Sequence, residues 1–225
     1  MNPTFLPFGD RAVLINFPQE IDETINQQVI LLSQKIEDQH WPEIETLIPA
    51  YCSLTVCFHF RKTTYAKMKE KIADLISQIE TESVTSFNRI VKVPVCYGGR
   101  YGPDLEEISQ QKELSESEII RLHTGQDFRV YMLGFLPGFA YMGKLPEALQ
   151  VSRKQTPRLK VAAGSVGLAG FQTGIYPSEA PGGWQIIGRT PLELFSPEKE
   201  TPFLFQPGDL VRFYAIEEAD FRSWE

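Results

Sequence analysis

In the first 80 positions, some segments repeat hydrophobic residues with the two-residue period of a strand and others with the 3.6-residue period of a helix. Residues 4–8 and 12–17 predict two strands that meet at a Gly-Asp turn, and residues 43–50 and 54–60 predict a second pair. The two helical stripes are Ile25, Val29, Leu32 and Ile36 in the first segment and Tyr65, Met68, Ile72, Leu75, Ile76 and Ile79 in the second. The order ββαββα predicts a small two-layer α/β domain over residues 1–82.

The pattern of hydrophobic residues, Gly and Pro changes after residues 81–88, a short polar segment where we expect the domain junction. Residues 104–111 and 115–122 predict two short helices, the second of which opens with a capping sequence, Ser-Glu-Ser-Glu. The predicted strands around and after them are short and separated by Gly and Pro, at 89–95, 128–133, 161–168, 183–188, 193–195 and 210–215. Such strands favour a closed or nearly closed β-barrel over residues 88–225.

Seven of the sixteen glycines lie between residues 160 and 190, namely Gly164, Gly167, Gly170, Gly174, Gly182, Gly183 and Gly188. A helix is disfavoured there, because each interior Gly costs about 1 kcal/mol relative to Ala. Phe171, Tyr176 and Trp184 supply apolar surface that favours burial over a disordered linker. We therefore expect a tightly turned β segment in which glycines let the backbone bend, bulge, or approach a ligand or partner closely, and we expect function here.

Charge and composition narrow the classes of partner. The chain has 22 basic and 29 acidic residues, a net charge of −7, which argues against nucleic acid or an anionic membrane as the main partner. The sequence lacks a signal-peptide pattern and an apolar run of about 18 residues, so we expect a soluble cytoplasmic protein. Three cysteines without a CxxC spacing predict free thiols and no metal site.

Residues 138–145 nearly match the phosphate-binding loop GxxxxGK[ST]. Leu145 stands where that loop needs a hydroxyl for magnesium, and Phe139, Tyr141 and Met142 fill positions where the backbone would have to approach a phosphate. We interpret the match as a coincidence.

Three residues of the second half are candidates for catalysis: His123, Arg158 and Arg189. His123 closes a predicted helix, where the helix dipole favours a cationic side chain, or it serves as a general base in the barrel cleft. Each arginine forms a structural salt bridge or binds a carboxylate or phosphate through its planar guanidinium. The residues alone leave these alternatives open.

The glycine-rich segment also holds candidates for binding a substrate or nucleotide. They are Ser165, Gln172, Thr173, Tyr176, Gly182 and Gly183, which combine hydrogen-bonding side chains with positions where the backbone is accessible. Ser165 is either a turn residue or a ligand contact. No Ser-His-Asp or Cys-His signature accompanies them, so nucleophilic catalysis by this chain alone lacks support.

The chain resembles a known family in segments that cover nearly all of its length: PFGDRAVLINF, PVCYGGRYGPDLEEIS, LGFLPGFAYMGKLPEAL, TPR, AAGSVGLAGFQTGIYPSEAPGGWQIIGRTPLELF and QPGDLVRF. That family includes the B subunit of 5-oxoprolinase, the KipI inhibitor of histidine kinases and allophanate hydrolase subunit 1. The resemblance implies an α+β protein: a small N-terminal two-layer α/β domain followed by a C-terminal cyclophilin-like β-barrel.

The resemblance further implies one component of an ATP-dependent 5-oxoprolinase, which hydrolyses 5-oxoproline to L-glutamate together with the C and A subunits of that enzyme. ATP would be shared with the complex, and Mg²⁺ is expected only as the ATP counter-ion. Arg158 and Arg189 would be oxyanion or phosphate anchors, and His123, Gln172 and Tyr176 would orient groups or transfer protons. We expect the chain to be inactive alone, because its own residues do not make a complete catalytic set.

A docking face for the partners is expected on the aromatic residues of the barrel, Phe135, Phe139, Tyr141 and Trp184, with tight binding of the 5-oxoprolinase C subunit. Two alternatives share the scaffold. A KipI-type inhibitor would use the same aromatic residues to bind a sensor histidine kinase. An allophanate hydrolase or carboxyltransferase-like subunit would act beside an amidase.

Overall fold

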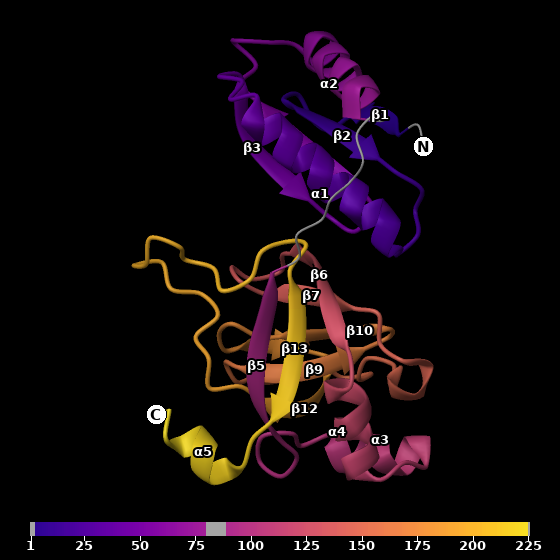
Figure 1. Ribbon diagram of the computed structural model, residues 1–225, viewed down its shortest axis with the longest axis vertical. Coiled ribbons are helices and arrows are strands. Elements are labelled where there is room, and N and C mark those ends of the chain that lie inside the picture. Colours follow the sequence, from indigo (N-terminus) through magenta and orange to yellow (C-terminus); the bar gives the residue numbers. More distant parts are fainter. Residues whose placement is uncertain (1–2, 80–88, 225) are drawn as a thin grey trace. The chain divides into compact units, whose positions relative to one another are not determined.

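The computed structural model describes residues 3–79 and 89–224 (Figure 1). Contacts between Cα atoms divide the chain into two compact units, residues 1–87 and 88–225. The junction expected at residues 81–88 lies outside the described residues. Each unit has its own hydrophobic core, which we describe separately.

The N-terminal unit packs two helices on an antiparallel sheet. Its elements are β1 (Thr4–Pro7), β2 (Ala12–Asn16), α1 (Glu23–Asp38), β3 (Ile44–Pro49), β4 (Ser53–Phe58) and α2 (Tyr65–Ile79). The strand order is β1-β2-β4-β3, and alternate residues such as Val13, Ile15, Leu54 and Val56 enter the core with the apolar stripes of the helices. The expected two-layer α/β class is confirmed.

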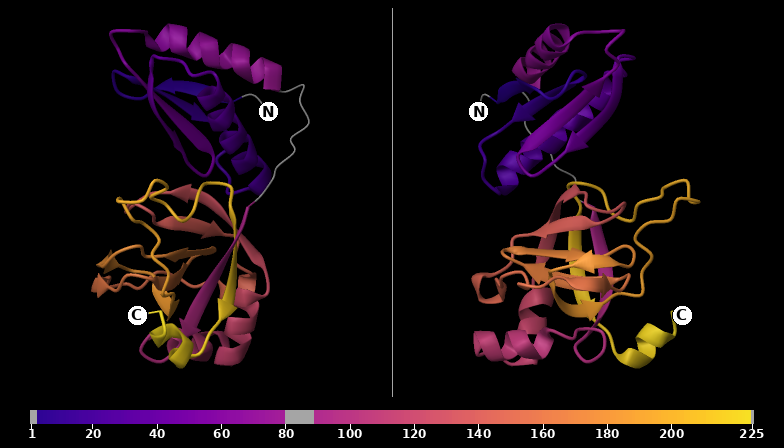
Figure 2. Two further views of the ribbon diagram at one scale, coloured as in Figure 1. Left: turned by 60° about the vertical axis from the view of Figure 1, so that its left-hand side comes forward. Right: turned by 180° about the vertical axis from the view of Figure 1, so that it is seen from behind.

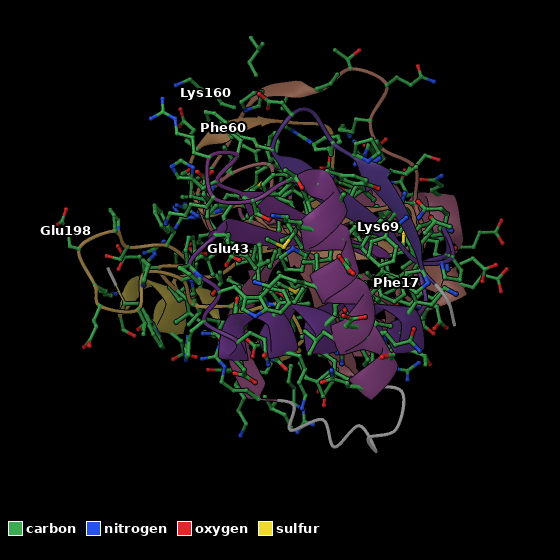
Figure 3. The ribbon with its side chains drawn as sticks, turned by 90° about the horizontal axis from the view of Figure 1, so that it is seen from above. Phe17, Glu43, Phe60, Lys69, Lys160 and Glu198 are labelled. Atoms are coloured by element: carbon green, nitrogen blue, oxygen red, sulfur yellow. The ribbon has the colours of Figure 1, made fainter. Side chains whose placement is uncertain are left out.

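Polar contacts cap the start of α1 and hold α2 against the sheet. The carboxylate of Asp22 caps α1 by accepting a hydrogen bond from the Ile25 backbone N–H at 3.0 Å. On α2, Lys71 donates to Glu43 at 2.6 Å, and the ammonium of Lys69 lies 5.8 Å from the ring centre of Phe5. Figure 3 looks onto α2, with Glu43 on one side of the helix and Lys69 on the other. These contacts tie α2 to both edges of the sheet.

The C-terminal unit is a closed barrel with strand order β10-β7-β6-β13-β5-β12-β9, in which β9 and β10 pair to complete the ring. Its strands are β5 (Ile90–Tyr97), β6 (Asp127–Leu133), β7 (Ala140–Gly143), β9 (Ser165–Ala169), β10 (Gln172–Ile175), β12 (Gln185–Arg189) and β13 (Leu210–Ala215). β5 and β13 are parallel, whereas the other pairs are antiparallel. The predicted barrel is confirmed.

Among the described residues, three α-helices lie near one end of the barrel, and a small ribbon lies outside its closed sheet (Figure 1). α3 (Leu105–Lys112) and α4 (Glu116–Thr124) contact each other near one end, and α5 (Glu218–Arg222) follows β13 near the C-terminus (Figure 1). Ser115 and Glu118 form the predicted capping box of α4. β8 (Arg158–Val161) and β11 (Ala180–Gly182) form a separate two-stranded ribbon, and a short 3₁₀ turn, η1 (Glu147–Leu149), lies between β7 and β8.

Some predicted strands of this unit were wrong. The strand expected at 161–168 is two strands, β8 and β9, because the chain turns at Gly164, whose φ is +79°. Residues 193–195 do not form a strand; Phe195 makes a single bridge with Phe203 within the long connection between β12 and β13 (Figure 2). β7 and β10 were not expected, and β7 occupies the segment that resembles a phosphate loop. No helix in residues 3–79 and 89–224 has the length and apolar character that crossing a membrane requires.

Candidate functional site

A cluster of charged side chains centres on Asp104, the residue that precedes α3. Asp104 is buried, and its Oδ1 accepts hydrogen bonds from Lys154 Nζ at 2.9 Å and Arg158 Nη2 at 2.5 Å. Its Oδ2 accepts from the backbone N–H of Ile186 at 2.6 Å. One carboxylate therefore joins the start of α3, the segment before the β8 ribbon, and barrel strand β12.

The cluster holds Asp104 and Lys154 in their charged forms. Burial alone raises the pKa of Asp104, but the hydrogen bonds from Arg158 and Lys154 outweigh it and lower the pKa below its ordinary value. The hydrogen bond to Asp104 raises the pKa of Lys154. Lys154 also contacts Glu107 at 3.0 Å and Gln185 at 3.2 Å, so its ammonium is bound on several sides.

Arg158 is the predicted catalytic residue that lies in this cluster, together with the predicted binding residues Gly182 and Gly183. Gly182 pairs with Arg158 in the ribbon, and the carbonyl of Gly183 accepts a hydrogen bond from the Lys154 backbone N–H at 2.7 Å. In the described part of the chain, Arg158 Nη1 is buried and makes no hydrogen bond. The salt-bridge alternative for Arg158 is realised through Asp104; its anion-binding role stays a prediction.

Sequence reasoning missed Asp104 and Lys154. Lys154 belongs to the basic stretch 153–160, and Asp104 precedes a predicted helix, so each carried only a local signal. The pairing joins positions fifty residues apart and depends on the barrel. No periodicity or motif in the sequence indicates that Asp104 and Lys154 form an ion pair.

Two adjacent glycines of the ribbon provide a matched test of the packing around Tyr176. An added Cβ at Gly182 would overlap the Oη of Tyr176, a buried side chain, whereas at Gly183 the nearest atoms lie at 3.7 Å. We expect Gly182→Ala to lower the free energy of unfolding by about 2 kcal/mol through overpacking, and Gly183→Ala to change it by less than about 0.5 kcal/mol. Urea unfolding of both variants measures the difference. Equal losses of unfolding free energy would contradict the conclusion that Gly182 is crowded and Gly183 is not.

The predicted docking residues mostly lie inside the protein. Phe139 and Trp184 are buried, at 1% and 4% exposure, and their ring centres lie 5.4 Å apart in a cluster that includes Tyr176. Tyr141 is half-buried against the same cluster, so burial removes Phe139 and Trp184 from any docking face. Phe135 is 60% exposed and remains available to a partner.

His123 is fully buried at the end of α4 and packs against the rings of Phe128 and Phe213, with centre-to-centre distances of 5.2 and 4.5 Å. Its Nδ1 lies 2.8 Å from Tyr97 Oη and its Nε2 lies 3.0 Å from Thr173 Oγ1. Thr173 donates its hydroxyl proton to the carbonyl of Gly167 and therefore accepts from Nε2–H, which leaves Nδ1 to accept from Tyr97.

This arrangement corrects the idea of a cationic His123 at a helix end. Burial lowers its pKa to about 3, so the ring is neutral near pH 7. Burial likewise raises the pKa of Tyr97. Both ring nitrogens are engaged and the side chain has no exposed surface, which favours a structural role over that of a general base for His123, and a supporting role for Thr173.

The remaining predicted residues lie on neighbouring barrel strands. Ser165 is buried on β9 and pairs with Arg189 of β12 in the strand register. Gln172 is half-buried on β10. Arg189 donates through Nε to the Ala163 carbonyl at 2.6 Å and lines a cleft of about 280 Å³ near α5. The two candidate arginines therefore lie in different settings, Arg158 in the Asp104 cluster and Arg189 in a cleft.

No group of three or more His, Cys, Asp and Glu side chains within residues 3–79 and 89–224 is placed to hold a metal ion. The three cysteines are free thiols. The charged groups that the two settings present are Arg158 and Lys154, which are paired with carboxylates in the Asp104 cluster, and Arg189 at the cleft.

Comparison with known proteins gives consistent matches over nearly the whole chain. Residues 3–205 match the family model described as carboxyltransferase domain, subdomain C and D. The chain is 41% identical to the 5-oxoprolinase B subunit of Bacillus subtilis (strain 168), covering 96% of this chain and 94% of the relative. It is 38% identical to the 5-oxoprolinase B subunit of Escherichia coli O157:H7, covering 91% and 92%.

Among solved structures, the crystal structure of TTHA0988 superposes with a TM-score of 0.82 at 33% identity. The match covers 92% of this chain and 40% of the other. The chain thus spans less than half the length of that protein, although it spans nearly the full length of the curated relatives.

Proposed function

Because the chain belongs to the family of the carboxyltransferase domain, subdomain C and D, with relatives named as subunits of 5-oxoprolinase, we propose that it is the B subunit of such an enzyme. In this proposal the complex hydrolyses 5-oxoproline to L-glutamate with cleavage of ATP. The observation that carries it is the 41% identity to a relative of that name over 96% of this chain. The proposed complex also contains the C and A subunits of 5-oxoprolinase, of which the C subunit binds this chain tightly.

The chemistry explains why such an enzyme would need energy input and several polypeptides. The lactam of 5-oxoproline is a stable amide, and phosphorylation of the amide oxygen at the expense of ATP would make ring opening favourable. Preorganised cations lower the barrier where negative charge develops on oxygen. In our proposal this chain supplies such cations, and a partner polypeptide supplies the groups that complete the site.

ATP enters this proposal as a co-substrate of the complex, with Mg²⁺ only as its counter-ion. The segment 138–145 does not fit a phosphate loop, because it contains strand β7 and buries Phe139 and Met142. The cleft at Arg189 is also small for a nucleotide, at about 280 Å³. In this proposal, therefore, neither the segment 138–145 nor the Arg189 cleft binds ATP.

The test of the proposal is reconstitution with the purified A and C subunits. The three proteins together are expected to convert 5-oxoproline to glutamate only with ATP, and omission of this chain is expected to lower the rate at least about 100-fold, since removing an essential part of a site costs several kcal/mol of transition-state stabilisation. Mixing the wild-type chain with only one partner tests the requirement for both. Equal turnover with and without this chain would reject the proposal.

A carboxyltransferase-type function is the second candidate, favoured by the description of the matching family model. The same reconstitution separates the two. A complex that ignores 5-oxoproline but, when given a carboxylated donor, transfers the carboxyl group to a urea-like acceptor and releases the decarboxylated donor would support the second candidate. The KipI-type alternative, binding to a sensor histidine kinase, stays a prediction.

A further inference from the structure

A cleft of about 280 Å³ lies beside Arg189, between the end of β12 and helix α5. Its walls include Pro177, Pro191 and Leu192 from the barrel side and Phe221 from α5. This volume is near the lower end of the range for small-molecule sites, so the cleft suits a ligand the size of an amino acid. The polar side chains among its lining residues are those of Arg189, Thr190 and Glu193, and a few placed polar groups beside apolar walls are usual in such sites.

The guanidinium of Arg189 is fixed at this cleft by two contacts. Nε donates to the Ala163 carbonyl at 2.6 Å, and Cζ lies 5.8 Å from the ring centre of Phe221. Phe221 is itself buried, and its ring centre lies 4.6 Å from that of Tyr101. Within residues 3–79 and 89–224, Arg189 Nη1 and Nη2 take no part in a hydrogen bond or ion pair, so they are available to a ligand.

The backbone around Arg189 is tightly packed, which holds the arginine in place. Thr190 donates its N–H to the carbonyl of Gly164 at 2.9 Å, and Gly164 donates to the carbonyl of Tyr176 at 2.7 Å. Gly164 has a φ of +79°, and an added Cβ would overlap the Thr190 carbonyl. A cation held by its own backbone neighbours loses little conformational freedom when it binds an anion, which strengthens binding.

The charges at the cleft select the kind of anion. Among the described residues that line it, Arg189 is the cation and Glu193 is the acid, and Lys199 balances Glu193 at 2.7 Å. One guanidinium matches one carboxylate, which it binds with two parallel hydrogen bonds, whereas a triphosphate needs several positive groups. We infer that the Arg189 cleft binds the carboxylate of a small cyclic or branched acid, with the apolar part of the ligand against Pro177, Pro191 and Phe221.

This inference deepens the proposed function, on which the choice of 5-oxoproline as the probe rests. The test compares 5-oxoproline with its carboxamide, which keeps the lactam ring but lacks the carboxylate charge. The wild-type complex is expected to favour 5-oxoproline by at least about 100-fold in kcat/KM, because an unpaired ligand group and an unmatched arginine are both costly. In a complex with Arg189→Gln, the preference should fall to less than about 5-fold, mainly through a higher KM for 5-oxoproline.

Two further variants complete the design. Arg189→Lys keeps the positive charge but loses the planar pair of N–H donors. It should therefore retain an intermediate preference, roughly 10-fold, for 5-oxoproline over the carboxamide. Arg121→Gln removes one exposed cation from α4, outside the cleft, and should leave the preference unchanged. Melting temperatures of the variants show whether each chain is folded.

The outcomes separate the inference from the proposed function. Turnover by wild type with an undiminished carboxylate preference in folded Arg189→Gln overturns the inference and leaves the proposed function standing. If the reconstituted wild type shows no turnover, ligand-detected NMR of the full chain with 5-oxoproline and its carboxamide decides: binding of the acid alone, lost in Arg189→Gln, supports the cleft. Equal binding of both compounds, or of neither, overturns it.

Discussion

Replacing Asp104 with alanine is expected to lower the free energy of unfolding of the barrel by about 3 kcal/mol. The change leaves Lys154 and Arg158 without their shared carboxylate and leaves the Ile186 backbone N–H without its acceptor. Losing one partner of a buried ion pair typically costs about 3–5 kcal/mol. We expect the lower end, because the side chains of Lys154 and Arg158 are 21% and 29% exposed and regain some solvation.

The matched control is Asp127→Ala, which also removes an aspartate that accepts from an arginine. Asp127 binds Arg212 through two hydrogen bonds of 2.6 and 2.7 Å, but the arginine is 49% exposed. An exposed pair of this kind contributes about 0–1 kcal/mol. Urea unfolding of both variants, with a barrel-specific probe, measures the contrast. Equal losses in the two variants would show that Asp104 is an ordinary surface partner.

The elements of the N-terminal unit could be predicted from sequence because each carries a complete local signal. The stripe from Ile25 to Ile36 spans more than two helical turns, and Asp22 supplies the cap that the structure contains. Alternation in β2 and β4 brings Val13 and Val56 onto the face that packs on the helices. The capping box at Ser115 is predictable for the same reason, because the residues that form it lie within one turn.

The barrel was harder to predict because its strands are short and glycine-rich. β7 and β10 have four residues each, too few to establish a two-residue period, and they are held by pairing with each other. Gly174 belongs to β10, where an added Cβ would crowd the Ala140 carbonyl and Trp184. A glycine that permits close packing between strands looks, in sequence, like a glycine that ends a strand.

The sequence predicted the types of residue in the candidate site, but not which groups their side chains bind. Arg158 and Arg189 are both at positions where a guanidinium has a defined partner, yet one binds a buried carboxylate and the other a backbone carbonyl. Whether an arginine has donors left for a ligand depends on contacts made across the fold. The same limit explains Phe139 and Trp184, because an aromatic residue beside glycine gives no local sign of being buried.

Acidification is expected to destabilise the barrel through His123. The pKa of His123 is about 3 in the folded protein and about 6.5 in an unfolded chain. Between these two pH values the ring is therefore mostly protonated in the unfolded state and mostly neutral in the folded state. Stability from the neutral ring is therefore complete above pH 6.5 and is lost as the pH falls toward 3. Between pH 7 and pH 5 the loss amounts to about 2 kcal/mol from this one side chain.

The measurement compares wild type with His123→Phe combined with Tyr97→Phe, which removes the titrating ring and the hydroxyl that it would leave unpaired. A phenyl ring suits a place beside Phe128 and Phe213, and Thr173 keeps its bond to Gly167. Urea unfolding at pH 7 and pH 5, read by hydrogen exchange in peptides from β6 and β13, should show that the double variant loses about 2 kcal/mol less than wild type.

A His59→Gln variant, changed in the N-terminal unit, should keep the wild-type dependence of the barrel on pH. The comparison concerns the slope with pH, so it holds even if the double variant is less stable at every pH. If wild type and the double variant respond equally, the His123 ring must already accept a proton in the folded state. It would then have access to water, and a role as a general base would become the better interpretation of His123.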